Sequence, residues 1–238
     1  MHIQNAVVLI TGANRGVGLA FAREALKRGA HKVYAGARDP DSVTLPGVEA
    51  LRLDVTRPDQ VAAAAARLRD VTLVINNAGI ARVGSMLKDD AIEALRAHLE
   101  TNALGTLRIA QAFAPVLARN GGGALLNVLS VLAWVSSPML GTYAASKSAA
   151  WSLTNALRIE LKAQQTQVLA LHMGFVDTDL TRDFALPKVS PESVVARAFD
   201  ALEAGHEEVL ADDITRQVRQ GLTAEPAIYL GERRQARD

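Results

Sequence analysis

The chain has 238 residues, of which 49% are hydrophobic and 21% charged, and its 26 basic and 25 acidic side chains leave a formal net charge of +1. These values are typical of a globular protein and offer no strong field for binding nucleic acid or an anionic membrane. The sequence has no cysteine, which excludes disulfides, thiolate nucleophiles and cysteine-based zinc sites. The amino-terminal apolar run is too short for a signal segment or a membrane span, so we expect a cytoplasmic protein.

Short apolar strands and helical patterns alternate along the chain. The predicted strands cover residues 6–10, 31–37, 48–53, 71–76, 124–130, 167–173 and 207–211. The predicted helices cover residues 16–28, 57–68, 89–118, 142–162 and 191–204. Near-continuous apolar strands joined by helices indicate a parallel sheet with right-handed crossovers. The sequence therefore predicts an α/β fold over residues 1–238: a single doubly wound Rossmann-type domain with a seven-stranded parallel sheet flanked by helices on both faces.

The loop after the first predicted strand is rich in glycine. It reads TGANRGVG over residues 11–18, with glycines at positions 12, 16 and 18. Such a turn lets the backbone approach a pyrophosphate, whose charge is then met by free N–H groups and the helix dipole. The pattern predicts a dinucleotide site beyond the carboxyl ends of the strands, although glycines also form tight turns for packing alone.

A tyrosine and a lysine stand one helical turn apart in the motif YAASK, at positions 143 and 147. Residues at this spacing share one face of a helix, and the small neighbours leave the pair open to a ligand. An ammonium beside a phenol favours the phenolate and brings its proton affinity toward the working range. Tyr143 is therefore a candidate general acid or base. The alternative is a tyrosine packed over a lysine stem on a solvated helix.

Further motifs follow in a regular order: LDVT at residues 53–56, NNAG at 76–79, Asn102 in the long helix predicted over residues 89–118, and Ser130 at the end of the fifth strand. Together with TGANRGVG and YAASK, they make the sequence similar to the short-chain dehydrogenase/reductase family, in its compact single-domain branch. The resemblance covers nearly the whole chain. We expect a cofactor half over about residues 1–120 and a catalytic and substrate half over about residues 121–238.

The resemblance implies an oxidoreductase that interconverts a ketone or aldehyde with an alcohol by hydride transfer. Tyr143 would be the general acid and base, and Lys147 would lower its pKa and hold the nicotinamide ribose. Ser130 would hydrogen-bond the substrate oxygen, and Asn102 would fix a water in a proton relay. Taken alone, a serine ending a strand is usually a turn residue, and an asparagine within a helix is usually a surface or packing residue.

Cofactor choice depends on the end of the second predicted strand, YAGARD. A carboxylate there would bind the ribose hydroxyl of NAD, whereas a cation would bind the 2′-phosphate of NADP. Arg38 and Arg15 favour NADP(H). In the alternative, Arg38 faces solvent and Asp39 approaches the ribose, as in an NAD-dependent alcohol dehydrogenase of the same family. The expected cofactor-binding residues are Gly12, Asn14, Arg15, Gly16, Val17, Gly18, Arg38, Asp54, Val55, Asn76, Ala78, Gly79, Tyr143, Lys147, Gly174, Val176 and Thr178.

Asp54 and the loop after the sixth predicted strand each depart from a simple cofactor contact. Asp54 would bind the adenine amino group, but it could instead cap the helix that begins near Pro58. After the sixth predicted strand the chain reads HMGFVDT, with Met173 where the family has proline. Loss of the proline predicts a less rigid loop, because φ at this position is no longer fixed. His172 has no second ligand at a zinc-like spacing, so no metal site is expected.

The segments near Ser130 and Thr178 contain apolar residues that bear on the substrate. Five apolar residues could wall a pocket for an apolar or aromatic carbonyl compound or alcohol, or could equally be core or dimer contacts: Leu132, Trp134, Met139, Phe175 and Phe184. The family commonly pairs subunits through its fourth and fifth helices, so we expect a homodimer or homotetramer. Two other functions stay open: a non-catalytic NADP-binding sensor or scaffold, and an epimerase or dehydratase of the longer branch, which carries a substantial C-terminal domain.

Overall fold

Seven parallel strands form one sheet within residues 1–182 and 184–230, the part of the chain that the computed structural model describes. The strands lie in the order β3-β2-β1-β4-β5-β6-β7. The predicted α/β class and seven-stranded parallel sheet are confirmed, with strand ends within two residues of the predicted ones. The bounds are β1 Val7–Thr11, β2 Lys32–Ala37, β3 Glu49–Arg52, β4 Leu73–Asn76, β5 Ala124–Val128, β6 Gln167–His172 and β7 Glu208–Leu210.

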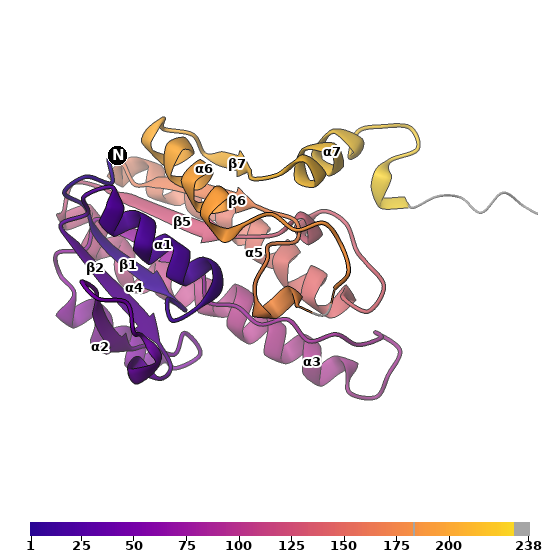
Figure 1. The fold of residues 1–238 in the computed structure, drawn as a ribbon, viewed down its shortest axis with the longest axis horizontal. Coiled ribbons are helices and arrows are strands. Elements are labelled where there is room, and N and C mark those ends of the chain that lie inside the picture. The colour runs from indigo at the N-terminus through magenta and orange to yellow at the C-terminus, as the bar shows by residue number, and fades with distance from the viewer. Residues whose placement is uncertain (183, 231–238) are drawn as a thin grey trace, which may run out of the picture.

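Helices cover both faces of the sheet (Figure 1). On one face, α1 (Gly16–Lys27) and α6 (Pro191–Glu203) pack against each other, with the rings of Phe21 and Phe199 5.3 Å apart. On the other face lie α2 (Pro58–Arg67), α4 (Gly105–Arg119) and α5 (Gly141–Glu160). Burial on both faces explains why β1 and β5 are buried at every position and mostly apolar, rather than apolar at alternate positions.

The helix predicted over residues 89–118 is divided in the structure. It consists of α3 (Ala91–His98), a π-helical segment (Leu99–Leu104) and α4. A π-helical turn accommodates an extra residue and often marks a functional site, and a hydrophobic pattern alone does not reveal it. The expected residue Asn102 lies in this segment and is buried.

Two elements after β7 were not predicted from the sequence: α7 (Asp213–Gly221) and a 3-10 turn (Ile228–Leu230). Only Thr215 is buried in α7, so the helix lacks the apolar stripe on which the prediction of helices depended. Its amino terminus is defined instead by Asp212, whose side chain accepts a hydrogen bond from the Thr215 N–H.

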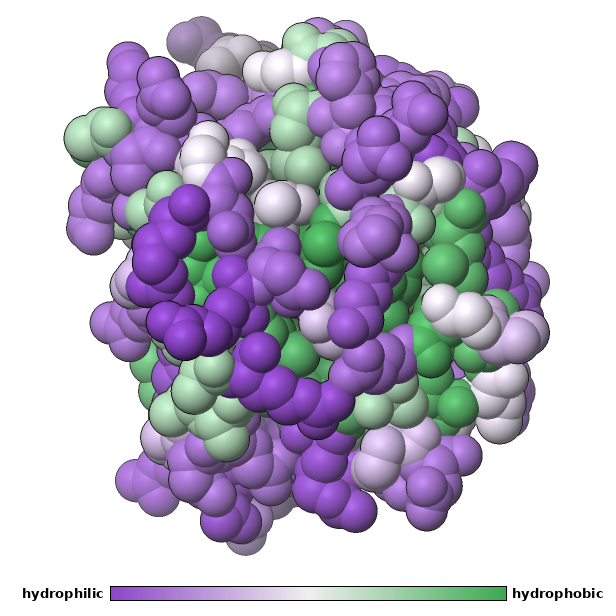
Figure 2. All heavy atoms as spheres, turned by 90° about the vertical axis from the view of Figure 1, so that its left-hand side faces the viewer, coloured by the Kyte–Doolittle hydropathy of each residue, from purple (hydrophilic) through white to green (hydrophobic). Residues whose placement is uncertain are grey.

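The crossovers diverge at β1, which pairs with β2 on one side and β4 on the other. Loops after these strands separate at their carboxyl ends, where doubly wound sheets bind ligands. The left-hand side of the molecule in Figure 1 is mainly hydrophilic, with hydrophobic residues visible between the polar ones (Figure 2). No helix among the described residues is long and apolar enough to cross a membrane.

Candidate active site

A cleft of about 590 Å³ opens at the carboxyl ends of the strands. Its walls come from the loops after β1, β3, β4 and β6, the ends of β2 and β5, and the first turns of α5. Most residues expected from the sequence to bind a cofactor line this cleft, although they are scattered along the chain. They are Gly12, Asn14, Arg15, Gly16, Val17, Arg38, Asp54, Val55, Ala78, Gly79, Tyr143, Lys147, Gly174, Val176 and Thr178.

The glycine loop needs its glycines for two different reasons. Gly12 and Gly16 have φ values of +68° and +54°, in the left-handed region that side chains disfavour. Gly18 does not line the cleft, but a Cβ there would lie 2.1 Å from the Gly12 carbonyl oxygen and 2.5 Å from Asn77 Nδ2. Gly18 therefore lets α1 approach the loop backbone. The uncapped first turn of α1 then faces the cleft, as an anion site at a helix terminus requires.

The motif NNAG contributes its second asparagine to the cleft rather than the expected first one. Asn76 is buried, and its Nδ2 donates to Asn127 Oδ1 at 2.9 Å. Asn77 lines the cleft, and its Nδ2 donates to the carbonyl oxygens of Thr11 and Gly12, both at 3.0 Å. The expectation for Asn76 is wrong because this residue still belongs to β4 and lies between the layers. Asn77 is the first residue beyond the strand.

Two arginines and one aspartate lie at the β2 end of the cleft. Arg38 is exposed, and Arg15, which is 67% exposed, has Nη1 3.8 Å from Asp179 Oδ2. Asp39 turns part of its carboxylate toward its own loop, where Oδ1 accepts from the Asp41 N–H at 3.2 Å. The two guanidinium groups thus provide positive charge at this end, at positions that solvent and a ligand both reach.

Asp54 forms a local turn just after β3. Its Oδ1 accepts hydrogen bonds from the N–H and the hydroxyl of Thr56, at 2.9 and 2.8 Å. The N-cap position of α2 is Arg57, so Asp54 does not cap that helix. The carboxylate of Asp54 remains part of the cleft wall.

Ser130, Tyr143 and Lys147 converge on the cleft from the end of β5 and the start of α5. Ser130 Oγ accepts from the Leu132 N–H at 3.1 Å, so this residue is a turn residue and a cleft residue together. Lys147 is buried, and its Nζ donates to the Val128 carbonyl oxygen at 2.8 Å. The same Nζ lies 5.8 Å from the centroid of the Tyr143 ring.

Burial controls the proton affinities of this pair. It raises the pKa of Tyr143 to about 12, and a hydrogen bond with Ser130 offsets only part of the rise. Burial also lowers the pKa of Lys147 to about 8. In this structure burial therefore outweighs the expected lowering of the Tyr143 pKa by Lys147, whose ammonium is directed at the Val128 carbonyl. The phenol keeps part of its surface exposed to the cleft.

Asn102 connects the loop after β4 to α5. Its Oδ1 accepts from the Ile80 N–H at 2.9 Å, and its Nδ2 donates to the Ile80 carbonyl and to Ser146 Oγ, both at 3.0 Å. Ser146 Oγ in turn donates to the Tyr143 carbonyl oxygen at 2.7 Å. The side chain lies behind the cleft wall, so its part in a proton relay stays a prediction.

His98 belongs to none of the sequence motifs, yet its ring packs against Tyr143, the proposed general acid. It is fully buried at the end of α3, and its ring lies edge-on to the Tyr143 ring at 6.0 Å. Its Nε2 accepts from the Arg82 N–H at 2.8 Å. Burial, and then the charge of Arg82, lower the pKa of His98, so the ring is neutral and serves as an acceptor.

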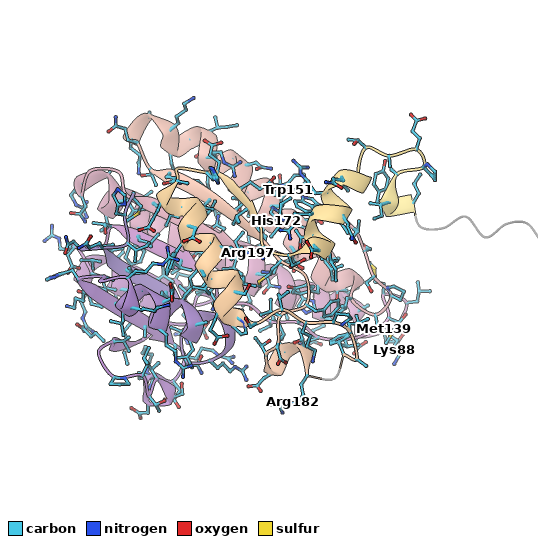
Figure 3. The ribbon with its side chains drawn as sticks, turned by 45° about the horizontal axis from the view of Figure 1, so that its top comes forward. Lys88, Met139, Trp151, His172, Arg182 and Arg197 are labelled. Atoms are coloured by element: carbon cyan, nitrogen blue, oxygen red, sulfur yellow. The ribbon has the colours of Figure 1, made fainter. Side chains whose placement is uncertain are left out.

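The five apolar residues proposed from the sequence as a pocket wall do not line the cleft that the described residues form. Trp134 instead stacks on the buried His172 at 3.9 Å and lies edge-on to Trp151 at 6.2 Å. His172 and Trp151 are labelled in Figure 3. Phe175 packs against Phe184 at 5.3 Å. Burial lowers the pKa of His172 to about 3, which leaves it a neutral core residue.

Comparison with known proteins explains the order of these motifs. Residues 6–188 match the family model described as short chain dehydrogenase. The chain belongs to this family. A relative, 1-deoxy-11-beta-hydroxypentalenate dehydrogenase of Streptomyces exfoliatus, is 32% identical over 223 residues, which cover 85% of this chain and 81% of that protein.

Solved structures of short-chain dehydrogenases share the fold. One from Burkholderia cenocepacia J2315, in complex with NADP, has a TM-score of 0.91 and 40% identity over 95% of this chain and 96% of that one. Another from Burkholderia phymatum, in complex with NAD, has a TM-score of 0.81 and 25% identity over 93% and 95% of the two chains. The family consists of oxidoreductases that bind a nicotinamide cofactor and act on small molecules. The cleft fits such a cofactor, because Gly18 lets α1 pack close to the glycine-loop backbone and the cations Arg15 and Arg38 lie at one end.

Proposed function

We propose that this short-chain dehydrogenase is an NADP(H)-dependent oxidoreductase that interconverts a ketone or aldehyde with an alcohol. The observation that carries the proposal is the separation of two chemistries along one cleft. Arg38 lies at the end of β2, and Ser130 with Tyr143 lies three strand positions away, at β5. A long ligand with an anionic end and a reactive end suits this arrangement.

The protein's own groups would bind and protonate the carbonyl. When bound, NADPH supplies the hydride that the carbonyl carbon accepts. Ser130 Oγ donates a hydrogen bond to the carbonyl oxygen, where negative charge develops, and Tyr143 Oη gives its proton to the same oxygen. A phenol with a pKa of about 12 carries its proton at neutral pH, as a donor must, but it is a weak acid, so transfer would depend on a charge that favours the phenolate. Lys147, when charged, offsets the charge of the phenolate that remains, and alcohol oxidation reverses these steps.

We propose an apolar or aromatic substrate, because apolar side chains lie around the reactive end of the cleft. Ile80, Met173 and Leu180 all contribute to its wall, and Leu180 is 51% exposed. The Streptomyces relative supports an alcohol or ketone as substrate, since its name describes a dehydrogenase of a hydroxylated compound.

The function is tested by NADPH oxidation with a panel of ketones and aldehydes, for the parent protein and for Tyr143→Phe. The substitution keeps the ring and removes only the hydroxyl, so NADPH should still bind while turnover falls by about 10²-fold or more. Near-normal turnover in Tyr143→Phe would show that another group donates the proton. A parent protein that binds NADPH but turns over no member of the panel would favour the sensor or scaffold function.

Cofactor preference is tested at Arg38. One or two charge-assisted hydrogen bonds to the 2′-phosphate would favour NADPH over NADH by about tenfold to a thousandfold. Arg38→Asp removes the attraction, repels the phosphate and offers the ribose hydroxyl of NADH an acceptor, so the preference should collapse or invert. The measurement is kcat/KM for both cofactors at low and high salt, because salt screens an exposed contact. Equal use of both cofactors by the parent protein would indicate that Arg38 faces solvent and that Asp39 approaches the ribose instead.

The domain organisation, assembly and location of the protein complete the proposal. We propose that the chain is one domain and forms a homodimer or homotetramer through α4 and α5, where Trp151 and Leu153 are only half-buried. Light scattering on the parent tests the assembly, and a monomer would contradict it. A cytoplasmic location stays a prediction from the sequence.

A further inference from the structure

The loop after β6 lacks the proline of the family but is restrained by a different group. Gly174, the second residue of this loop, lines the cleft beside Met173. Its N–H donates to Asp212 Oδ2 at 2.6 Å, across 38 positions of the sequence. A hydrogen bond from an amide to a carboxylate is stronger than one between neutral groups, so this contact fixes the peptide that joins Met173 to Gly174.

The Asp212 carboxylate is itself held in place. The residue is only 5% exposed, and its Oδ1 accepts from the N–H and the hydroxyl of Thr215, both at 2.8 Å. It therefore caps α7, whose amino-terminal dipole favours a carboxylate at this position. The preceding residue, Ala211, is held too, since its carbonyl accepts from Arg197 Nη1 of α6 at 2.8 Å.

The loop and the carboxylate are in close contact at Gly174. A Cβ at this position would lie 3.2 and 3.3 Å from the two carboxylate oxygens of Asp212, closer than most side chains tolerate. Glycine thus allows the loop backbone to reach the acid. On the other side, the Met173 carbonyl oxygen accepts from the Val131 N–H at 2.9 Å, which ties the loop to the residue after Ser130.

Position 173 would accept a proline without losing a hydrogen bond. The Met173 N–H donates to no acceptor among the described residues. The residue before it, His172, ends strand β6, and residues that precede proline favour this extended conformation. A proline ring and the Asp212 carboxylate would therefore restrain the same short stretch of backbone by different means.

We propose that Asp212 is a positioning residue that fixes the wall of the cleft from Gly174 to Thr178, in place of the restraint that a proline at position 173 would supply. The inference rests on the proposed function, in which this wall holds the nicotinamide end of NADP(H). Helix α7 then has a role in cofactor binding, because its amino terminus orients the carboxylate.

The test compares Asp212→Ala, Asp212→Asn, Met173→Pro and the double variant Met173→Pro/Asp212→Ala. Fluorescence titration gives the dissociation constants of NADPH and of adenosine 2′,5′-bisphosphate, a probe that contains only the adenosine end. Asp212→Ala should weaken NADPH binding about tenfold and lower kcat, because a charge-assisted hydrogen bond is lost, and should leave binding of the bisphosphate unchanged. Asp212→Asn keeps one acceptor oxygen and should recover part of the loss.

The double variant provides the decisive result. Met173→Pro should restore most of the NADPH affinity that Asp212→Ala loses, with Met173→Pro alone as the reference for the loss of the methionine side chain. Absence of this restoration would overturn the inference, as would equal weakening of NADPH and bisphosphate binding by Asp212→Ala. The matched control is Asp213→Ala, since this neighbour is 86% exposed and pairs with Arg216 away from the cleft. It should leave all binding constants unchanged.

Hydrogen exchange gives a readout that needs no ligand. In the parent protein the Gly174 amide should exchange slowly, and Asp212→Ala should speed its exchange about tenfold or more without changing the segment around Gly12. Unchanged exchange at Gly174 would overturn the inference. Absence of NADPH binding by the parent would instead contradict the proposed function, so the two failures are distinguishable.

Discussion

Arg28 joins two helices that lie far apart in the sequence, and its removal should strongly destabilise the protein. Its Nε donates to Glu24 of α1 at 2.9 Å, and its Nη1 donates to Glu203 of α6 at 2.9 Å. Its Nη2 donates to Asp200 at 2.7 Å and to the Ala196 carbonyl at 3.2 Å. The Arg28 side chain is only 19% exposed, so water competes for few of these hydrogen bonds.

The size of the destabilisation depends on how deeply each carboxylate that Arg28 contacts is buried. Glu24 and Glu203 are 18% and 28% exposed, and a hydrogen bond to a charged group of this kind stabilises by about 1.5–3 kcal/mol. Asp200 is 67% exposed, so its pair adds little. Because contributions within one network do not add fully, we expect Arg28→Ala to lower the free energy of unfolding by about 2–4 kcal/mol.

Urea unfolding at pH 7 measures this change, with Arg57→Ala as the matched control. Arg57 also pairs with a carboxylate, Asp59, at 3.2 Å, but the two side chains are 59% and 64% exposed. Such a pair stabilises by at most about 1 kcal/mol. Similar losses in Arg28→Ala and Arg57→Ala would refute the reasoning, because burial of the network would then make no difference.

The effect of Arg28→Ala should also depend on pH. Burial tends to raise the pKa of Glu24, but hydrogen bonds from Arg28 and Lys27 outweigh it and leave the pKa below the usual 4.5. A carboxylate with a lowered pKa contributes stability above its unfolded pKa and loses it as the pH falls through the folded value. The difference between parent and variant should therefore be full at pH 7 and shrink below about pH 4.5. A difference that stays constant down to pH 3 would contradict this cause.

Three further predictions concern the cleft. Gly18→Ala should abolish measurable NADPH binding, because its Cβ would lie 2.1 Å from the Gly12 carbonyl oxygen, and calorimetric binding at parental affinity would refute this. Asn77→Ala should weaken NADPH binding about tenfold, because two hydrogen bonds to the glycine loop are lost; an unchanged dissociation constant would contradict it. Carbonyl reduction should be level from about pH 6 to 7 and then fall with a midpoint near pH 8, where Lys147 loses its charge while Tyr143 stays protonated. A kcat/KM that rises between pH 8 and 10 would show that the lysine charge is not required.

The sequence by itself determined the fold class and most of the cleft, because these depend on local patterns. Apolar strands alternating with helices predicted the parallel sheet, whose strand ends lie within two residues of the predicted ones. The glycines at positions 12, 16 and 18 predicted a turn from strand into helix, and the structure has that turn, with positive φ at Gly12 and Gly16. Tyr143 and Lys147 line one cleft because residues four apart share a helix face.

Only the tertiary structure decided which neighbours these residues meet. Whether Asn76 or Asn77 reaches the cleft depends on the residue at which β4 ends. Lys147 donates to a carbonyl of β5. This contact and burial set the proton affinities of Tyr143 and Lys147, whereas the helix spacing alone suggested a lowered pKa for Tyr143. Asp212 reaches Gly174 only because β7 pairs with β6. Burial and hydrogen bonds between distant segments arise when the layers pack, so a local sequence pattern does not contain them.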